Sequence, residues 1–203
     1  MNWPFTGLER GKYTVIYADP PWRYRTFSDK GLGRSAESHY QTMTLEEICA
    51  LPVKDLAARE GCHLFLWTTG PCLPQAFQVM ERWGFRYSST AFVWVKLRRR
   101  EQELFFDKNS FFVGMGHTTR KNCEYCLLGR RGKPRRLSKA VRELVVAPVQ
   151  EHSRKPEEVR ERIERYAAGP YAEMFARRRT AGWEAWGNQV DLFPPALGVG
   201  AAS

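Results

Sequence analysis

The sequence predicts an α/β protein with a doubly wound, mostly parallel sheet. The first observation is a run at residues 13–18 that is almost entirely apolar, β-branched and aromatic, which is typical of a strand buried on both faces. The second is the alternation of two further apolar runs with helical patterns over residues 44–96, as in right-handed βαβ units. The third is that polar residues follow the ends of these strands, the edge at which open α/β sheets bind ligands.

The first half of the chain alternates strands with helices. Thr44 and Glu47 form the capping-box pattern of a helix start, and Pro52 interrupts the helix that follows. A second apolar run predicts a strand, a helical segment is ended by Gly84, and a third apolar run predicts another strand. These elements are expected at residues 13–18, from residue 44, at 62–68, at about 74–83 and at 89–96.

The second half adds four strands and a helix. Pro156 suits the first position of a helix, and Glu157 and Glu158 suit its positive start. No linker divides the chain, so we expect one domain over residues 1–193 and a mobile tail, rich in Pro, Gly and Ala, over residues 194–203. The elements are expected at residues 122–128, 144–147, 156 to about 167, 171–176 and 183–186, with a basic turn at 130–136.

The composition is that of a basic globular protein. Its 203 residues, 43% of them hydrophobic, are enough for a sizeable core. A formal net charge of +10 favours a polyanionic partner, and nucleic acid is the first candidate. A basic protein without such a partner is the alternative, but the charge is clustered at residues 98–100, 130–136 and 177–179.

The five cysteines form no disulfide-like framework, which predicts a reducing compartment. The sequence has neither an apolar run of membrane-spanning length nor a signal-peptide pattern, so we expect a cytoplasmic protein without membrane contact. Cys123 and Cys126 are spaced as C-x-x-C, but residues three apart in a strand face opposite sides. Buried cysteines are therefore favoured over a metal site. No G-x-G-x-x-G pattern supports a dinucleotide-binding fold.

A carboxylate, two prolines and an indole follow the first strand directly. The prolines lack N–H donors and fix the backbone, so the turn is expected to be stiff, with Trp22 exposed at its end. Asp19 and the Pro20 carbonyl could accept the two hydrogens of an exocyclic amine such as that of adenine, while Trp22 stacks on the base or faces a cation. The alternative is an aspartate that caps a turn and a tryptophan that only packs.

Six motifs resemble those of one family. The Asp-Pro-Pro-Trp sequence is similar to the signature of the DPPW adenine-N6 methyltransferases, the MT-A70 family. Further segments resemble the Y-x-T-M, F-L-W-x-T-G, W-V-K, S-H-K-P and G-N-Q-x-D motifs of that family. They lie, in this order, at residues 39–43, 64–70, 94–96, 153–156 and 187–191. The order, with the acceptor-base motif first, resembles the circularly permuted β-class of amino methyltransferases.

The resemblance implies a Rossmann-like methyltransferase fold with S-adenosyl-L-methionine as cofactor. It implies that Lys155 receives the methionyl carboxylate beside a helix start and that two amides bind the ribose hydroxyls. The catalytic residues would be Asp19, Pro20, Pro21 and Trp22, and the cofactor residues Asp19, Lys155, Arg177, Arg179, Asn188 and Gln189.

Two long connections are candidates for target contacts. Residues 23–43 are expected to be a lid or target-binding loop, with a surface loop of no role as the alternative. Residues 97–120 interleave basic and aromatic residues, which suits a segment that grips a nucleic-acid backbone, although the same aromatics could pack a small subdomain. The candidate target residues are Tyr24, Tyr40, Lys96, Arg98, Arg99, Arg100, His117 and Arg120.

The sequence therefore predicts methylation of adenine N6 in nucleic acid, with DNA favoured over RNA and no metal. The target base has to be flipped or single-stranded to reach such a site. One alternative is a catalytically silent nucleic-acid-binding subunit with the same fold. A weaker one is methylation of a small-molecule or protein amine. Self-association as a homodimer is considered by analogy with paired relatives.

Overall fold

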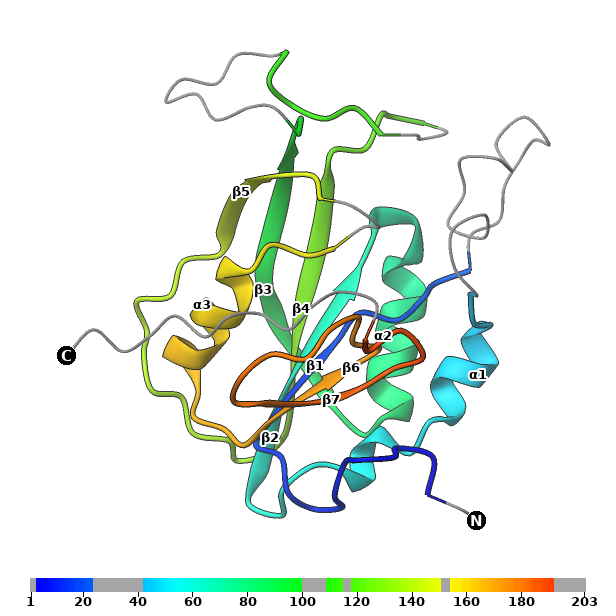
Figure 1. The fold of residues 1–203 in the computed structure, drawn as a ribbon, viewed down its shortest axis with the longest axis vertical. Coiled ribbons are helices and arrows are strands. Elements are labelled where there is room, and N and C mark those ends of the chain that lie inside the picture. The colour runs from blue at the N-terminus through cyan, green and yellow to red at the C-terminus, as the bar shows by residue number, and fades with distance from the viewer. Residues whose placement is uncertain (1–2, 24–41, 100–108, 115–117, 151–153, 192–203) are drawn as a thin grey trace.

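The computed structural model describes residues 3–23, 42–99, 109–114, 118–150 and 154–191. In this part of the chain seven strands form one sheet in the order β5-β3-β4-β2-β1-β6-β7 (Figure 1). Four of the six neighbouring pairs are parallel, so the predicted α/β class with a mostly parallel sheet is confirmed. The strands are β1 (Val15–Ala18), β2 (Gly61–Thr68), β3 (Arg86–Leu97), β4 (Cys123–Gly132), β5 (Leu144–Pro148), β6 (Tyr171–Met174) and β7 (Trp183–Trp186).

Helices cover both faces of the sheet. α1 (Leu45–Ala50) and α2 (Leu73–Arg82) lie on one side and α3 (Glu158–Tyr166) lies on the other (Figure 1). Successive residues of a strand face opposite sides, so β1 contributes to two cores. Ile16 packs in the core that contains α1 and α2, and Tyr17 packs in the core that contains α3.

β1 lies between two parallel neighbours in the sheet. All four of its residues are buried, and it pairs in parallel with β2 on one side and with β6 on the other. Ala18, its last residue, lies in register with Leu66 and Met174. Asp19, the residue that follows Ala18, therefore lies at the carboxyl end of β1, between the ends of β2 and β6.

β4 runs against both of its neighbours, β2 and β3. It begins at the edge where the parallel strands end, so its first residues meet the ends of β2 and β3. It also continues to Gly132, beyond the predicted end at residue 128. Arg130 and Arg131 therefore belong to the strand, and the prediction of a basic turn that starts at residue 130 is wrong for these two residues.

The helix starts follow the predicted capping chemistry only in part. The Thr44 hydroxyl accepts a hydrogen bond from the Glu47 amide at 3.2 Å, and the Glu47 carboxylate accepts one from the Thr44 amide at 2.8 Å. Pro52 ends this helical segment and precedes a short 3-10 turn, Val53–Asp55. α3 begins at Glu158, two residues later than predicted, because Glu157 is its N-cap.

Three predictions from the sequence concern disulfides, metal sites and membrane-spanning segments. All five cysteines are free, and no cluster of metal-ligating side chains occurs in the ranges given above. None of the helices placed by the structure is long and apolar enough to cross a membrane. Most of the predicted loop at residues 23–43, part of the one at 97–120 and the tail at 194–203 lie outside the described residues.

Candidate active site

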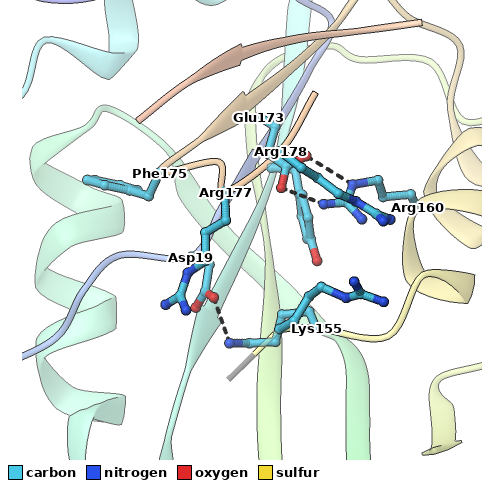
Figure 2. A pocket seen from close by; sticks show the side chains of 9 residues that line it. Asp19, Lys155, Arg160, Glu173, Phe175, Arg177 and Arg178 are labelled. Atoms are coloured by element: carbon cyan, nitrogen blue, oxygen red, sulfur yellow. Dashed lines mark hydrogen bonds and ion pairs between the residues drawn. The ribbon is translucent and has the colours of Figure 1, made fainter. Parts of the chain in front are cut away.

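Asp19 follows β1 directly and forms an ion pair with a lysine from far along the chain. Its Oδ2 atom lies 2.7 Å from Nζ of Lys155, which is in the segment that leads into α3 (Figure 2). The Lys155 side chain is only 8% exposed, so this pair is shielded from water on most sides. Because charges attract more strongly away from water, the pair fixes the position of both groups at the carboxyl edge of the sheet.

Glu124, near the start of β4, extends this pair into a chain of four charges. Its carboxylate lies 3.2 Å from Nζ of Lys155 and also binds Nζ of Lys96, at the end of β3. Burial alone would raise the pKa of Glu124, but the two ammonium groups outweigh that effect and lower the pKa below its usual value. The carboxylate is therefore ionised, and it holds both lysines.

Glu124 was not among the residues predicted from the sequence. A glutamate between apolar residues near a strand start gives a weak signal, and its location depends on the direction of β4. In a parallel strand the same residue would lie at the opposite edge of the sheet.

Two backbone hydrogen bonds are formed by the turn after Asp19. The Trp22 amide donates to the Pro20 carbonyl at 2.8 Å, and the Met43 amide donates to the Pro21 carbonyl at 2.9 Å. These bonds leave one lone pair on each carbonyl, because a carbonyl oxygen accepts two hydrogen bonds.

The prediction that Trp22 is exposed is wrong. It is 4% exposed and packs in the core with α1 and α2, and its indole N–H donates to the Trp67 carbonyl at 3.0 Å. A buried indole needs a partner for its N–H, and the end of β2 supplies one. Near the charge chain, cations instead face the indoles of Trp67, whose ring centroid is 5.4 Å from Nζ of Lys155, and Trp94, whose ring centroid is 4.9 Å from Nζ of Lys96.

A pocket opens beside Asp19 and Lys155 (Figure 2). Its empty volume, including the part open to solvent, is about 400 Å³. Of the two arginines expected to contact the cofactor, Arg177 lines this pocket, whereas Arg179 is not among its lining residues and pairs with Asp191 at 3.0 Å. The lining residues are Tyr17, Asp19, Arg154, Lys155, Arg160, Glu173, Phe175, Arg177 and Arg178.

One wall of the pocket is a buried ion pair that sequence reasoning did not find. The Arg160 guanidinium donates two hydrogen bonds to the Glu173 carboxylate, at 2.9 and 2.6 Å, and lies over the ring of Tyr17 (Figure 2). Arg178 reaches Glu157 at the start of α3. The segment after β6 is thereby tied to the segment that carries Lys155. No single motif contains these partners, so only the fold reveals them.

Asn188 and Gln189 follow β7, beside the end of β6. Phe175 has a left-handed backbone, with φ of 61°, which ends β6, and the Ala176 amide donates to the Trp186 carbonyl at 2.9 Å. A Cβ on Gly187 would lie 2.6 Å from the Ala176 carbonyl oxygen, so the two segments touch closely at this glycine. The predicted amides therefore leave β7 next to Arg177, although they do not line the pocket itself.

The predicted target residues are placed only in part. Lys96 lies in the charge chain, while Arg98, Arg99 and Arg120 are exposed near the end of β3 and the start of β4. The Arg98 amide donates to the Ser110 carbonyl at 3.0 Å, so residue 110 lies beside the end of β3. The other four, Tyr24, Tyr40, Arg100 and His117, lie outside the described residues.

Comparison with known proteins identifies the family of this chain. The family model described as MT-A70 matches residues 13–189, which include Asp19, Glu124, Lys155 and Gln189. The chain belongs to the MT-A70 family. The protein is thus a methyltransferase, and the predicted family, Rossmann-like fold and reaction class are confirmed.

MT-A70 relatives of two kinds match the chain. It is 33% identical to the type II methyltransferase M.MunI of Mycoplasma sp. over 92% of this chain and 81% of that protein. It is 32% identical to a putative N(6)-adenosine-methyltransferase MT-A70-like protein of Medicago truncatula and 29% identical to the human N(6)-adenosine-methyltransferase catalytic subunit METTL3. These two matches cover 89% of this chain but only 27% and 29% of the relatives.

Proposed function

We propose that the protein transfers the methyl group of S-adenosyl-L-methionine to N6 of adenine in nucleic acid, with DNA favoured over RNA. The observation that carries this proposal is the Asp19 carboxylate, fixed by Lys155 at the carboxyl edge of the sheet and followed by a stiff proline turn. The bacterial type II methyltransferase, covered over most of its length, is the better guide to the substrate. The preference for DNA rests on this comparison.

The pocket suits a ligand with both an ammonium and a carboxylate group. Asp19 offers a carboxylate and Lys155 an ammonium on the same side of the pocket, and Arg177 adds a second cation. Such alternating charges match the amino-acid end of S-adenosyl-L-methionine. Asn188 and Gln189, beside the end of β6, are proposed to bind its ribose hydroxyls. When bound, the cofactor supplies an electrophilic methyl group on a sulfonium.

The residues of the turn are proposed to bind the acceptor amine. Asp19 accepts one N–H of the adenine amine, and the Pro20 carbonyl accepts the other through its free lone pair. With both hydrogens held, the nitrogen lone pair is directed away from the turn, and alignment of two reactants is itself a large part of catalysis. The proton that leaves the amine can pass to Asp19. Trp22 supports the turn from the core instead of stacking on the base.

The target adenine has to leave the base stack of the nucleic acid to reach the carboxyl edge of the sheet. A base within a duplex cannot approach a carboxylate at the end of β1, so a flipped or single-stranded adenine is required. The exposed Arg98, Arg99 and Arg120 lie at this same edge and are proposed to contact its flanking phosphates.

The test is transfer of labelled methyl to adenine-containing DNA and RNA, single- and double-stranded, with Asp19→Ala alongside. Label in adenine N6 that vanishes in the variant supports the proposal and selects the substrate. Label on RNA alone would reverse the preference for DNA. Absence of cofactor binding by calorimetry, together with no transfer, would favour the silent-subunit alternative.

Self-association is a separate proposal that rests on analogy with paired relatives. Sedimentation of the protein with and without an oligonucleotide tests it. A species of twice the monomer mass supports a homodimer, and a monomer under both conditions contradicts it.

A further inference from the structure

The edge of the sheet opposite the active site carries a cluster of exposed cations. β4 starts beside Asp19 and ends where β2 begins, with Gly132 in register with Gly61. At about 3.3 Å per residue, Arg131 lies roughly 23 Å from Glu124 along the strand. We define the amino-edge basic surface as Arg130, Arg131, Lys133, Arg135, Arg136, Lys139 and Arg142, all of them exposed.

These cations are not neutralised by carboxylates. Glu143 is the only acidic residue between positions 129 and 143. Within the part of the chain that the structure describes, none of the seven forms an ion pair with a carboxylate. Arg130 even lies in register with the exposed Arg86 of β3. Like charges opposite one another destabilise a sheet, so the fold tolerates a repulsion that a neutral pair would remove.

The surface is held in place by the fold. The Lys133 amide donates to the Glu60 carbonyl at 3.0 Å, and the Leu137 amide donates to the Tyr166 carbonyl at 2.7 Å. Arg162 of α3 donates to the carbonyls of Arg142 and Leu144, at 2.8 and 2.7 Å. The segment is thus fastened at both of its ends, and the backbone that carries its cations has a defined position before any ligand arrives.

We propose that the amino-edge basic surface binds the phosphate backbone of nucleic acid outside the segment held at the active site. This inference rests on the proposed function, since it takes the substrate itself as the polyanion. Exposed cations that extend from the end of β4 to the start of β5 suit a long polyanion better than a small anion. Arginine groups bind phosphates with geometric specificity, and five of the seven residues are arginines.

The separation of the two edges sets a length requirement. In a stacked B-form strand, at about 3.4 Å per nucleotide, a span of roughly 23 Å corresponds to about seven nucleotides. Shorter stacked oligonucleotides can occupy the active site but do not reach the second surface. Longer ones bind at both places, and the second contact adds affinity without a change at the reacting atoms.

The test compares Arg131→Gln/Arg135→Gln/Arg136→Gln with the charge-conserving control Arg131→Lys/Arg135→Lys/Arg136→Lys. Fluorescence anisotropy measures binding to an adenine-containing hexanucleotide and to a duplex of about 40 base pairs, without methyl donor and over a range of salt. For the duplex, the glutamine variant is expected to bind about 10 to 100-fold more weakly, with a salt slope shallower by about two to three. Its binding to the hexanucleotide and its turnover on it are expected to stay unchanged. The lysine control is expected to keep the salt slope of the unaltered protein, because it keeps the three charges.

Three results would overturn the inference: an unchanged salt slope on the duplex, an equal loss of binding on the short and the long substrate, or unchanged duplex binding with lost binding to vesicles of anionic lipid. The last would assign the surface to a membrane. Failure of the proposed function looks different, because the unaltered protein would then bind nucleic acid without methylating it, or would not bind it at all.

Discussion

Nζ of Lys155 lies 2.7 Å from Oδ2 of Asp19, which joins two residues that are 136 positions apart in the chain. The same ammonium lies 3.2 Å from Glu124, so one lysine is shared by two carboxylates. This one cation therefore helps to position both carboxylates, Asp19 and Glu124. The geometry of the proposed methyl-transfer site therefore depends on a residue outside the Asp-Pro-Pro-Trp turn.

Lys155→Met tests this dependence. The variant keeps the length of the side chain but removes the charge, so the two carboxylates face each other with less compensation. We expect methyl transfer to fall by about 100-fold or more and the free energy of unfolding to fall by about 3 kcal/mol. Radiolabel transfer and urea unfolding measure the two effects. Lys155→Arg, which keeps the charge, is the matched control and should unfold nearly as the unaltered protein does. Normal turnover in Lys155→Met would contradict the role.

Glu124→Gln should destabilise the protein and slow transfer, because Lys96 and Lys155 lose their common carboxylate. We expect a loss of about 2–4 kcal/mol. The pKa of Glu124 is lowered, so its contribution is present above the ordinary pKa of 4.5 and is lost as the pH falls through the folded-state value. The difference between the variant and the unaltered protein should thus shrink below pH 4.5. Urea unfolding at several pH values checks this, and a difference that is constant with pH would contradict it.

Gly187→Ala should disturb the cofactor end of the site more than the fold. Its Cβ would lie 2.6 Å from the Ala176 carbonyl oxygen and 2.7 Å from the Ala176 amide nitrogen, so the backbone after β6 or β7 has to shift. We expect about tenfold weaker binding of S-adenosyl-L-methionine by calorimetry. Gly70→Ala is the control, since a Cβ there meets nothing within 4 Å. Equal cofactor binding by both variants would show that the contact at Gly187 does not position Asn188 and Gln189.

His63 makes the fold sensitive to mild acid. It is 2% exposed, packs against Tyr166 with ring centroids 5.1 Å apart, and neither ring nitrogen makes a hydrogen bond of ordinary geometry within the described residues. Burial lowers its pKa to about 4, and the charges of Arg130 and Arg136 act in the same direction. The unfolded chain takes up a proton near pH 6.5 and the folded chain only near pH 4, so stability falls between these values.

His63→Phe should remove this loss, which is at most about 3 kcal/mol. Thermal unfolding between pH 7 and pH 4 measures it. The pH dependence of the variant should be flatter in this window, while the window of Glu124 below pH 4.5 remains. An identical pH dependence in the two proteins would show that folding does not lower the pKa of His63.

The sequence predicted all seven strands, because each is a short apolar or aromatic run whose burial follows from local pattern. It also predicted that Asp19 and Lys96 lie at one edge, since both follow strand ends. It did not find Glu124, because the direction of β4 is set by pairing with β2 and β3 and not by the composition of β4. The burial of Trp22 was missed for a similar reason, as its partner is the Trp67 carbonyl at the end of another strand.

The sequence pattern also did not indicate which of the three consecutive arginines at residues 177–179 face the pocket. Arg177 and Arg178 line it and Arg179 does not. The left-handed backbone at Phe175 turns the chain at the end of β6, so the side chains that follow do not alternate as they would in a continued strand. Only the folded backbone resolves such a choice.

The distance along the chain between Asp19 and Lys155 also bears on how the enzyme is made. A ribosome synthesises β1 early, but β6, one of its two neighbours in the sheet, is among the last strands to emerge. Until then one side of β1 is an unpaired strand edge, and such edges are prone to wrong pairing. Contacts between remote parts of a chain also form slowly, because a long loop has to close first. For most of its synthesis the nascent polypeptide therefore contains Asp19 but not yet Lys155 or β6, which position it. Methyl transfer begins only when the C-terminal strands have docked.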